Sequence, residues 1–151
     1  GRVKPAAPEP VDVVELVRAV IGDLDSELRS HAVAVELELG ELPTVTAGRI
    51  ELRQAFLNIL LNAIQAQPNG GAVRISGAVR RNRLVLQFAD SGPGIEPRLR
   101  SRVFEPFFTT REKGSGLGLF SVRRTIESHG GRVSIGDAGG KGTIVEVTLP
   151  L

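Results

Sequence analysis

The chain has 151 residues, of which 41% are hydrophobic and 24% charged, an ordinary composition for one globular domain with its own core. It contains no cysteine, which excludes a disulfide, a thiolate metal site and a thiol nucleophile. The net charge is only +2 and phenylalanine is the only aromatic residue, so we expect no nucleic-acid surface.

Residues 1–10 contain three prolines and no hydrophobic periodicity, so we interpret them as a linker or the end of an upstream helical hairpin, with the domain at 11–151. Asp12 and Glu15 have the spacing of a capping box at the start of a helix. Apolar residues then recur at helical spacing as far as Leu28. Residues 33–39 alternate like a half-buried strand, and 40–48 are expected to be a connection.

The rest of the chain continues this mixture of helices and strands. A helical pattern covers about 49–67 and stops at Pro68-Asn69-Gly70-Gly71. Two alternating runs, 73–79 and 83–90, predict an antiparallel hairpin. A short helix is expected over 97–103, a loop over 105–115 and a helix over 116–129. Strands are expected over 132–135 and 143–149.

This order predicts an α/β (α+β) two-layer sandwich. We expect a mixed, mostly antiparallel sheet of about five strands, with three main helices on one face. The alternation of the strands fits a sheet whose other face is exposed. No apolar run approaches the ~20 residues that cross a bilayer. There is no signal-peptide pattern and no initiator Met, so we expect a cytoplasmic fragment without membrane contact of its own.

Asn58 and Asn62 lie four residues apart and therefore share one face of the 49–67 helix. Their amide oxygens suit Mg²⁺, which prefers oxygen ligands and usually bridges phosphates. Two exposed polar residues on an amphipathic helix would have the same spacing, so the pair alone does not decide between these interpretations.

Asp90 ends an apolar strand and is followed by Ser91-Gly92-Pro93-Gly94. A carboxylate there can accept a hydrogen bond from an exocyclic amine, and the glycines let a flat ring approach the backbone. The alternative is a plain turn, because all these residue types favour turns.

Further along, three phenylalanines fall within 104–108, and Gly114, Gly116 and Gly118 lead into the 116–129 helix. The free N–H groups at a helix N-terminus attract phosphate, and glycines allow it to approach closely. The glycines are not a Rossmann fingerprint, since no strand immediately precedes them. Solvation or core packing would also account for parts of this segment.

Four stretches together resemble the N, G1, F and G2 boxes of the ATP-binding catalytic domain of sensor histidine kinases, which has the Bergerat fold. They are residues 58–63, 90–94, 104–110 and 114–119. Gln65-Ala66 replaces the lysine and aromatic residue of many members and is similar to the nitrogen-regulator type. The resemblance implies that ATP and Mg²⁺ are the cofactors and that Asn62 is the metal ligand. It implies nucleotide contacts from Asn58, Asn62, Asp90, Gly92, Gly94, Ile95, Phe104, Thr109, Thr110, Gly114, Ser115, Gly116, Leu117, Gly118, Leu119 and Thr143.

The same resemblance separates phosphoryl transfer from hydrolysis. Hydrolysing relatives have a glutamate four residues before the metal-binding asparagine, where this chain has Asn58. The resemblance therefore implies transfer, with a catalytic role for Asn58. It also implies that the F box is the hinge of a mobile ATP lid, in which the cations Arg111 and Lys113 have catalytic roles. Neither His31 nor His129 lies in a phosphoacceptor context, and we expect both to be structural.

The expected partner is a dimeric, histidine-bearing helical hairpin that is absent from this chain, with a response regulator receiving the phosphate indirectly. The isolated domain is then expected to be a monomer that phosphorylates itself little or not at all. Two alternatives stay open: an ATP-gated binding module without phosphotransfer, and a serine kinase of the anti-sigma type.

Overall fold

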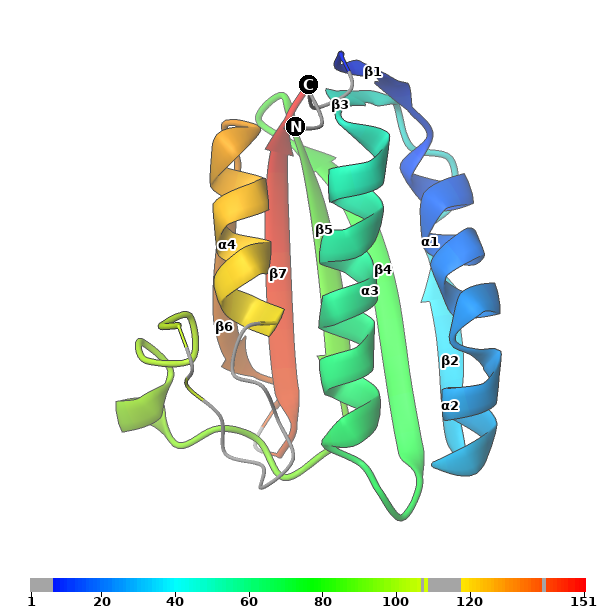
Figure 1. Ribbon diagram of the computed structural model, residues 1–151, viewed down its shortest axis with the longest axis vertical. Helices are drawn as coiled ribbons and strands as arrows, with labels where there is room; N and C mark the ends of the chain where they lie inside the picture. The colour runs from blue at the N-terminus through cyan, green and yellow to red at the C-terminus, as the bar shows by residue number, and fades with distance from the viewer. Residues whose placement is uncertain (1–6, 107, 109–117, 140) are drawn as a thin grey trace, which may run out of the picture.

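The computed structural model describes residues 7–106, 108, 118–139 and 141–151. Four helices cover one face of a five-stranded sheet, as Figure 1 shows. The predicted two-layer sandwich is therefore confirmed. Among the described residues, no helix combines the length and the apolar character needed to span a membrane.

The large sheet has the strand order β2-β4-β5-β7-β6. Its strands are β2 (Val33–Glu38), β4 (Gly71–Arg80), β5 (Arg83–Asp90), β6 (Arg132–Asp137) and β7 (Thr143–Pro150). Strands β2 and β4 are parallel and all other neighbours are antiparallel, so the sheet is mixed as predicted. The β4–β5 hairpin is the one expected around Arg81 and Asn82.

Helix α3 (Arg49–Gln65) packs centrally on the sheet between α1 (Val13–Asp23) and α4 (Gly118–Ser128) (Figure 1). Its apolar stripe is buried against inward-facing residues of β5, which alternate with residues that are exposed or half-buried, apart from the buried Val85. Phe56 of α3 and Phe88 of β5 meet with their ring centroids 5.8 Å apart. This contact fixes the central helix over the strand that ends in Asp90.

The structure differs from the predicted elements in four places. Glu9 and Pro10, which we placed in a linker, belong to β1 (Glu9–Val11), and the 40–48 connection contains its partner β3 (Val45–Ala47). The first helix is divided at Leu24 into α1 and α2 (Asp25–Ser30). The segment 97–103 forms only a 3₁₀ turn over Pro97–Leu99. Short strands and single-residue breaks have too little periodicity to be recognised.

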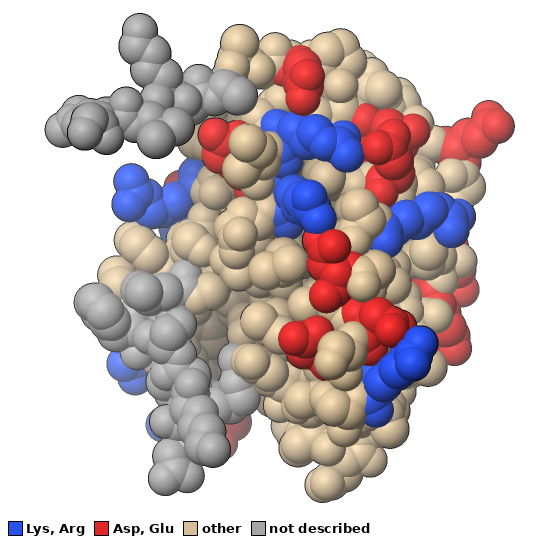
Figure 2. All heavy atoms as spheres, turned by 45° about the vertical axis from the view of Figure 1, so that its right-hand side comes forward, with Lys and Arg blue, Asp and Glu red and all other residues tan. Residues whose placement is uncertain are grey.

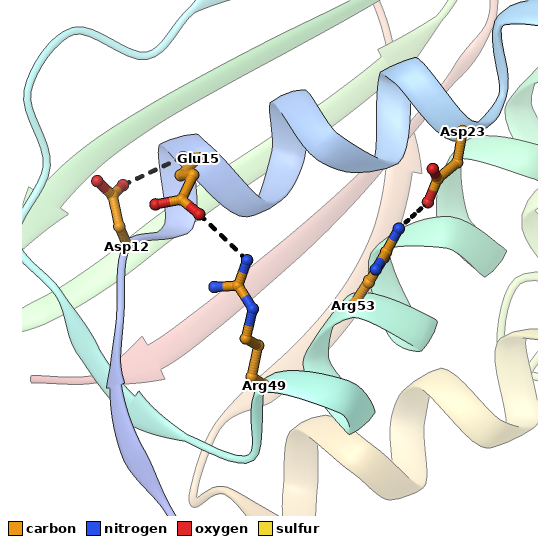
Figure 3. Close-up of polar contacts among 5 residues, drawn as sticks. All are labelled: Asp12, Glu15, Asp23, Arg49 and Arg53. Atoms are coloured by element: carbon orange, nitrogen blue, oxygen red, sulfur yellow. Dashed lines mark hydrogen bonds and ion pairs between the residues drawn. The ribbon is translucent and has the colours of Figure 1, made fainter.

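Side chains at both ends of α1 join this helix to α3 (Figure 3). Asp12 caps α1 as predicted, with its Oδ1 accepting a hydrogen bond from Glu15 N at 3.1 Å. The Glu15 carboxylate pairs with Arg49 at 3.2 Å, and Asp23 pairs with Arg53. Figure 2 shows the outer surface on this side, where basic and acidic side chains are interspersed. Neither sign of charge dominates this face.

His129 connects the end of α4 to the start of α3. Its Nδ1 lies 2.7 Å from the Thr125 carbonyl, and its Nε2 accepts a hydrogen bond from the buried Gly48 N–H at 3.0 Å. The Gly48 N–H can only donate, so Nε2 carries no proton and Nδ1 donates to Thr125. The sequence prediction of a structural histidine at this helix end agrees with these contacts.

We expect His129→Ala to lower the free energy of unfolding by about 1–3 kcal/mol, because the buried Gly48 N–H loses its acceptor. Thermal or urea unfolding would measure this loss. His31→Ala is the matched control, since His31 Nδ1 forms its hydrogen bonds with Ser30 and Glu27, within its own helix turn. Equal effects of the two substitutions would contradict the bridging role of His129.

Candidate nucleotide site

The ends of α3, β5 and α4 that carry predicted site residues lie at one end of the sandwich, the lower end in Figure 1. There the last turns of α3 lie beside the start of α4 and the end of β5. Thr109, Thr110, Arg111, Lys113, Gly114, Ser115, Gly116 and Leu117 lie outside the described residues, so their predicted roles stay predictions.

Asn58 lies at the junction of α3 and α4. Its Nδ2 donates to Ser121 Oγ at 3.1 Å, and its Oδ1 accepts from Gln54 Nε2 at the same distance. Ser121 Oγ in turn donates to the Gly118 carbonyl at 3.0 Å. The amide of Asn58 thus links α3 to the first turn of α4, a contact between residues 63 positions apart that the sequence did not reveal.

Asn62 lies one turn further along the same face of α3. A β-carbon placed on Gly118 would lie 3.9 Å from both Oδ1 and Nδ2 of Asn62. The first residue of α4 is therefore next to the Asn62 amide. Because the first N–H groups of a helix have no partner within it, this arrangement brings N–H donors and an amide oxygen to one place.

Asp90 ends β5 with a side chain that is almost buried, since the residue is only 8% exposed. The Gly92 N–H donates to its Oδ1 at 2.9 Å, and Thr143, its neighbour in β7, also supplies a backbone hydrogen bond. Burial raises the pKa of Asp90 above 3.8, and the two backbone hydrogen bonds oppose this rise. A single carboxylate is thus held in one orientation at the end of a central strand.

This raised pKa has a consequence for stability. The folded state binds this proton more tightly than the unfolded chain, so protonation of Asp90 adds to the free energy of unfolding. This contribution is complete below pH 3.8 and is lost as the pH rises through the raised pKa. We therefore expect Asp90→Asn to be at least as stable as the wild type at pH 7. Thermal unfolding of both proteins should show this difference shrinking toward acid pH. A difference that stays constant with pH would contradict the raised pKa.

Glycines let the loop after Asp90 pack closely. A β-carbon on Gly92 would lie 3.0 Å from Asp90 Oδ1 and 3.2 Å from the Ala66 carbonyl. Gly94 has a positive φ of 83° and lies against Gly142, in the turn before β7. The carbonyl of Ile95 accepts from Arg100 Nε at 3.3 Å. The predicted glycines therefore hold this loop between the end of α3 and the β6–β7 turn.

A surface pocket of about 250 Å³ lies beside this loop. It is lined by Ala66, Gln67, Pro68, Asn69, Gly70, Ser91, Gly92, Pro93 and Lys141. Of the predicted site residues it includes only Gly92. The pocket adjoins the Asp90 loop without enclosing Asp90 itself, so it does not by itself mark the ligand position.

Phe104 and Leu119 flank the undescribed residues and make different contacts. The Arg123 guanidinium of α4 lies 5.8 Å from the centroid of the half-buried Phe104 ring, a cation–π contact. Leu119 is partly buried against the core cluster. Thr143 is buried beside Asp90.

The donor chemistry near Asn62 fits Mg²⁺ only together with a phosphate ligand. Within the described ranges, no three His, Asp or Glu side chains are grouped so that they could hold a metal ion. An amide oxygen is a suitable hard ligand, but one such ligand leaves most of the coordination sphere to water and phosphate oxygens. This agrees with a cation that arrives with a nucleotide.

Residues 47–151 match the family described as histidine kinase-, DNA gyrase B- and HSP90-like ATPases. The chain belongs to this ATPase family. Among curated relatives, sporulation kinase E of Bacillus subtilis is 33% identical over 141 residues, covering 92% of this chain and 19% of that protein. The sensory histidine kinase/phosphatase NtrB of Rhodobacter capsulatus is 31% identical, covering the whole chain and 46% of NtrB. The ATPase-family chain thus spans less than half the length of these relatives.

Solved histidine kinase structures have the same fold as this ATPase-family domain. The nucleotide-free catalytic domain of histidine kinase ThkA superposes with a TM-score of 0.87 at 28% identity, covering 96% of each chain. Full-length ShkA in complex with AMPPNP gives a TM-score of 0.86 at 30% identity, covering 99% of this chain and 32% of ShkA. The predicted membership of the histidine kinase catalytic domains is confirmed, including the likeness to NtrB.

Proposed function

We propose that this domain binds ATP with Mg²⁺ and donates the γ-phosphate to a histidine on a separate, dimeric helical hairpin. The observation that supports the proposal is that three different chemical groups lie at the same end of the fold. These are the Asn62 amide, the oriented Asp90 carboxylate and the first turn of α4. Each group suits a different part of the nucleotide.

Asp90 would recognise adenine. Its carboxylate can accept a hydrogen bond from the 6-amino group, and the Gly92 N–H keeps it in place at 2.9 Å. Gly92 and Gly94 let the loop pack closely against the end of α3 and against Gly142, which keeps the loop beside the Asp90 carboxylate. ShkA, a protein of the same fold, was solved with the ATP analogue AMPPNP, which supports an adenine nucleotide as the ligand.

The start of α4 and Asn62 would hold the triphosphate. Backbone N–H groups at a helix N-terminus attract phosphate oxygens. The Asn62 oxygen would contribute one ligand to Mg²⁺, which when bound supplies charge neutralisation on the phosphates. Arg111 and Lys113, as predicted from the sequence, would add positive charge from the lid.

The reaction would be an in-line displacement at the γ-phosphorus. A nitrogen of the acceptor imidazole forms the new P–N bond, the P–O bond to the β-phosphate breaks, ADP leaves and the imidazole gives its proton to solvent. Asn58 supports transfer over hydrolysis, because a neutral amide that donates to Ser121 is no general base for water. Positioning and charge neutralisation would account for most of the catalysis.

The partners follow from the same chemistry. The chain spans less than half of the length of sporulation kinase E or of NtrB. The phosphoacceptor hairpin and the signal-sensing regions are therefore proposed and lie outside this chain. ThkA was solved in complex with the response regulator TrrA. We infer that a response regulator would take the phosphate from the histidine of the hairpin.

A transfer assay with two separate proteins tests this function. The domain is mixed with its purified cognate hairpin and ATP labelled at the γ-phosphate. We expect acid-labile label on the hairpin histidine and none on the domain alone. Tight ATP binding without any transfer would instead favour the nucleotide-gated module. Label on His31 or His129 of the isolated domain would contradict the structural roles given to both.

A further inference from the structure

Gln67 is a buried polar residue at the turn between α3 and β4, and it is only 3% exposed. Its Nε2 donates to the carbonyls of Ala63 and Ala72 at 3.1 and 3.2 Å. Its Oε1 accepts from the Ala72 N–H at 3.0 Å and from the Ser91 hydroxyl at 2.6 Å. One side chain thus makes four hydrogen bonds to three different segments of the chain.

The surroundings of this side chain require an amide. Two carbonyl oxygens face its nitrogen and two donors face its oxygen, so only one orientation of the amide satisfies all four groups. A carboxylate would bring an oxygen against two carbonyls, and a methionine would satisfy none of the four. Gly71 makes room for the amide, because a β-carbon there would overlap Gln67 Oε1.

The hydrogen bonds of Gln67 lead directly to the Asp90 loop. Ser91, whose hydroxyl donates to Gln67, separates Asp90 from Gly92. The backbone N–H of Ser91 donates to the Ala72 carbonyl at 3.2 Å, and its Oγ accepts from the Ala72 N–H at 3.0 Å. A β-carbon on Gly92 would lie 3.4 Å from Gln67 Cγ. Gln67 therefore packs against Gly92, whose N–H orients the Asp90 carboxylate, and bonds to the residue before it.

The other side of the network is the helix that carries Asn62. Ala63, whose carbonyl accepts from Gln67 Nε2, is the next residue after Asn62. Gln67 thus connects the helix turn assigned to the phosphates with the loop assigned to adenine.

We propose that Gln67 is a positioning residue for adenine recognition. It holds Ser91 and Gly92 against the end of α3, so that the Gly92 N–H keeps the Asp90 carboxylate aimed at the 6-amino group. This inference rests on the proposed function, because it assumes that Asp90 reads adenine. It adds a residue that touches no ligand and selects adenine through the loop.

Nucleotide discrimination tests this role. ATP and inosine triphosphate differ at position 6 of the purine, where adenine has an amine and inosine has a carbonyl oxygen. Calorimetry with both nucleotides and Mg²⁺ would be run on the wild type, Gln67→Met, Ser91→Ala and Gln87→Met. Gln87 is the matched control. It lies on β5, and its side chain donates a 2.7 Å hydrogen bond to Glu146 on the face of the sheet away from the helices. The Gln87→Met variant loses this bond.

We expect Gln67→Met to weaken ATP binding by about tenfold, equivalent to ~1.4 kcal/mol, with little change for inosine triphosphate. Ser91→Ala should shift the ratio of the two affinities in the same direction by less, since Gln67 keeps its bond to the Ala72 N–H. Gln87→Met should leave the ratio unchanged. These three results together would support the positioning role.

An unchanged ratio in Gln67→Met, even with a lower melting temperature, would overturn the proposal and leave Gln67 a purely structural residue. If Gln67→Met does not fold, the ratio in Ser91→Ala decides in the same way. Failure of the proposed function would be seen in the wild type, which would then bind neither nucleotide, and both proposals would fall together. Failure of the Gln67 role alone would be seen only in the variants.

Discussion

Asp90→Asn is expected to weaken ATP binding by at least about tenfold without unfolding the domain. The carboxylate has two acceptor oxygens, whereas the amide presents an NH₂ group that would oppose the 6-amino group of adenine. The Gly92 N–H, which now donates to Oδ1 at 2.9 Å, still finds an acceptor in the amide oxygen. The substitution thus changes the ligand contact more than the fold.

Stability separates this effect from damage to the structure. Burial disfavours the charged form of Asp90, so removal of the charge should leave the protein at least as stable at pH 7. Calorimetry with an ATP analogue, beside thermal unfolding of the free protein, measures both quantities. Asp25→Asn, at an exposed ion pair of α2, is the matched control and should keep wild-type affinity. Unchanged affinity in Asp90→Asn would remove the adenine assignment.

Gly142→Ala is expected to be the most damaging small substitution near the site. Gly142 has a positive φ of 99°, and a β-carbon there would overlap the Asp90 carbonyl. The left-handed backbone alone costs about 1–2 kcal/mol for a residue with a β-carbon. The overlap adds strain that only a shift of the Asp90 backbone can relieve, so we expect a total loss of about 3 kcal/mol or more.

The same turn offers a matched control. Gly139 also has a positive φ, of 79°, but a β-carbon there would meet no atom within 4 Å. Gly139→Ala should therefore lower the free energy of unfolding only by the cost of the left-handed backbone. For a domain of this size, 1 kcal/mol shifts the melting temperature by roughly 2–4 °C. Equal melting temperatures for the two variants would contradict the predicted contact between Gly142 and Asp90.

The two variants also separate the effects on binding. Gly142→Ala moves the strand end that carries Asp90, so it should weaken binding of an ATP analogue as well as stability. Gly139→Ala should retain the affinity, measured well below its melting temperature. Loss of stability in Gly142→Ala with full affinity would show that the Asp90 side chain tolerates a shift of its backbone.

Hydrophobic periodicity predicted the main elements correctly because each pattern lies within one continuous segment of the chain. The alternation in β5 and the stripe on α3 both follow from burial of one face against the other layer. The pairing of β1 with β3 was missed because three residues show no period, and their pairing depends on contact across the fold. The break at Leu24 was missed because the apolar spacing continues through it.

The sequence by itself determined the layers of the fold and the family, and it supplied the residue types of the proposed site: two amides, one acid and a set of glycines. These follow from local patterns and from the order of short motifs along the chain. Only the tertiary structure decided how polar groups from distant segments combine. Asn58 with Ser121, His129 with Gly48, and Gln67 with Ser91 are pairs that no local pattern indicates. A buried polar group must find a partner wherever packing brings one, and packing is a property of the whole fold.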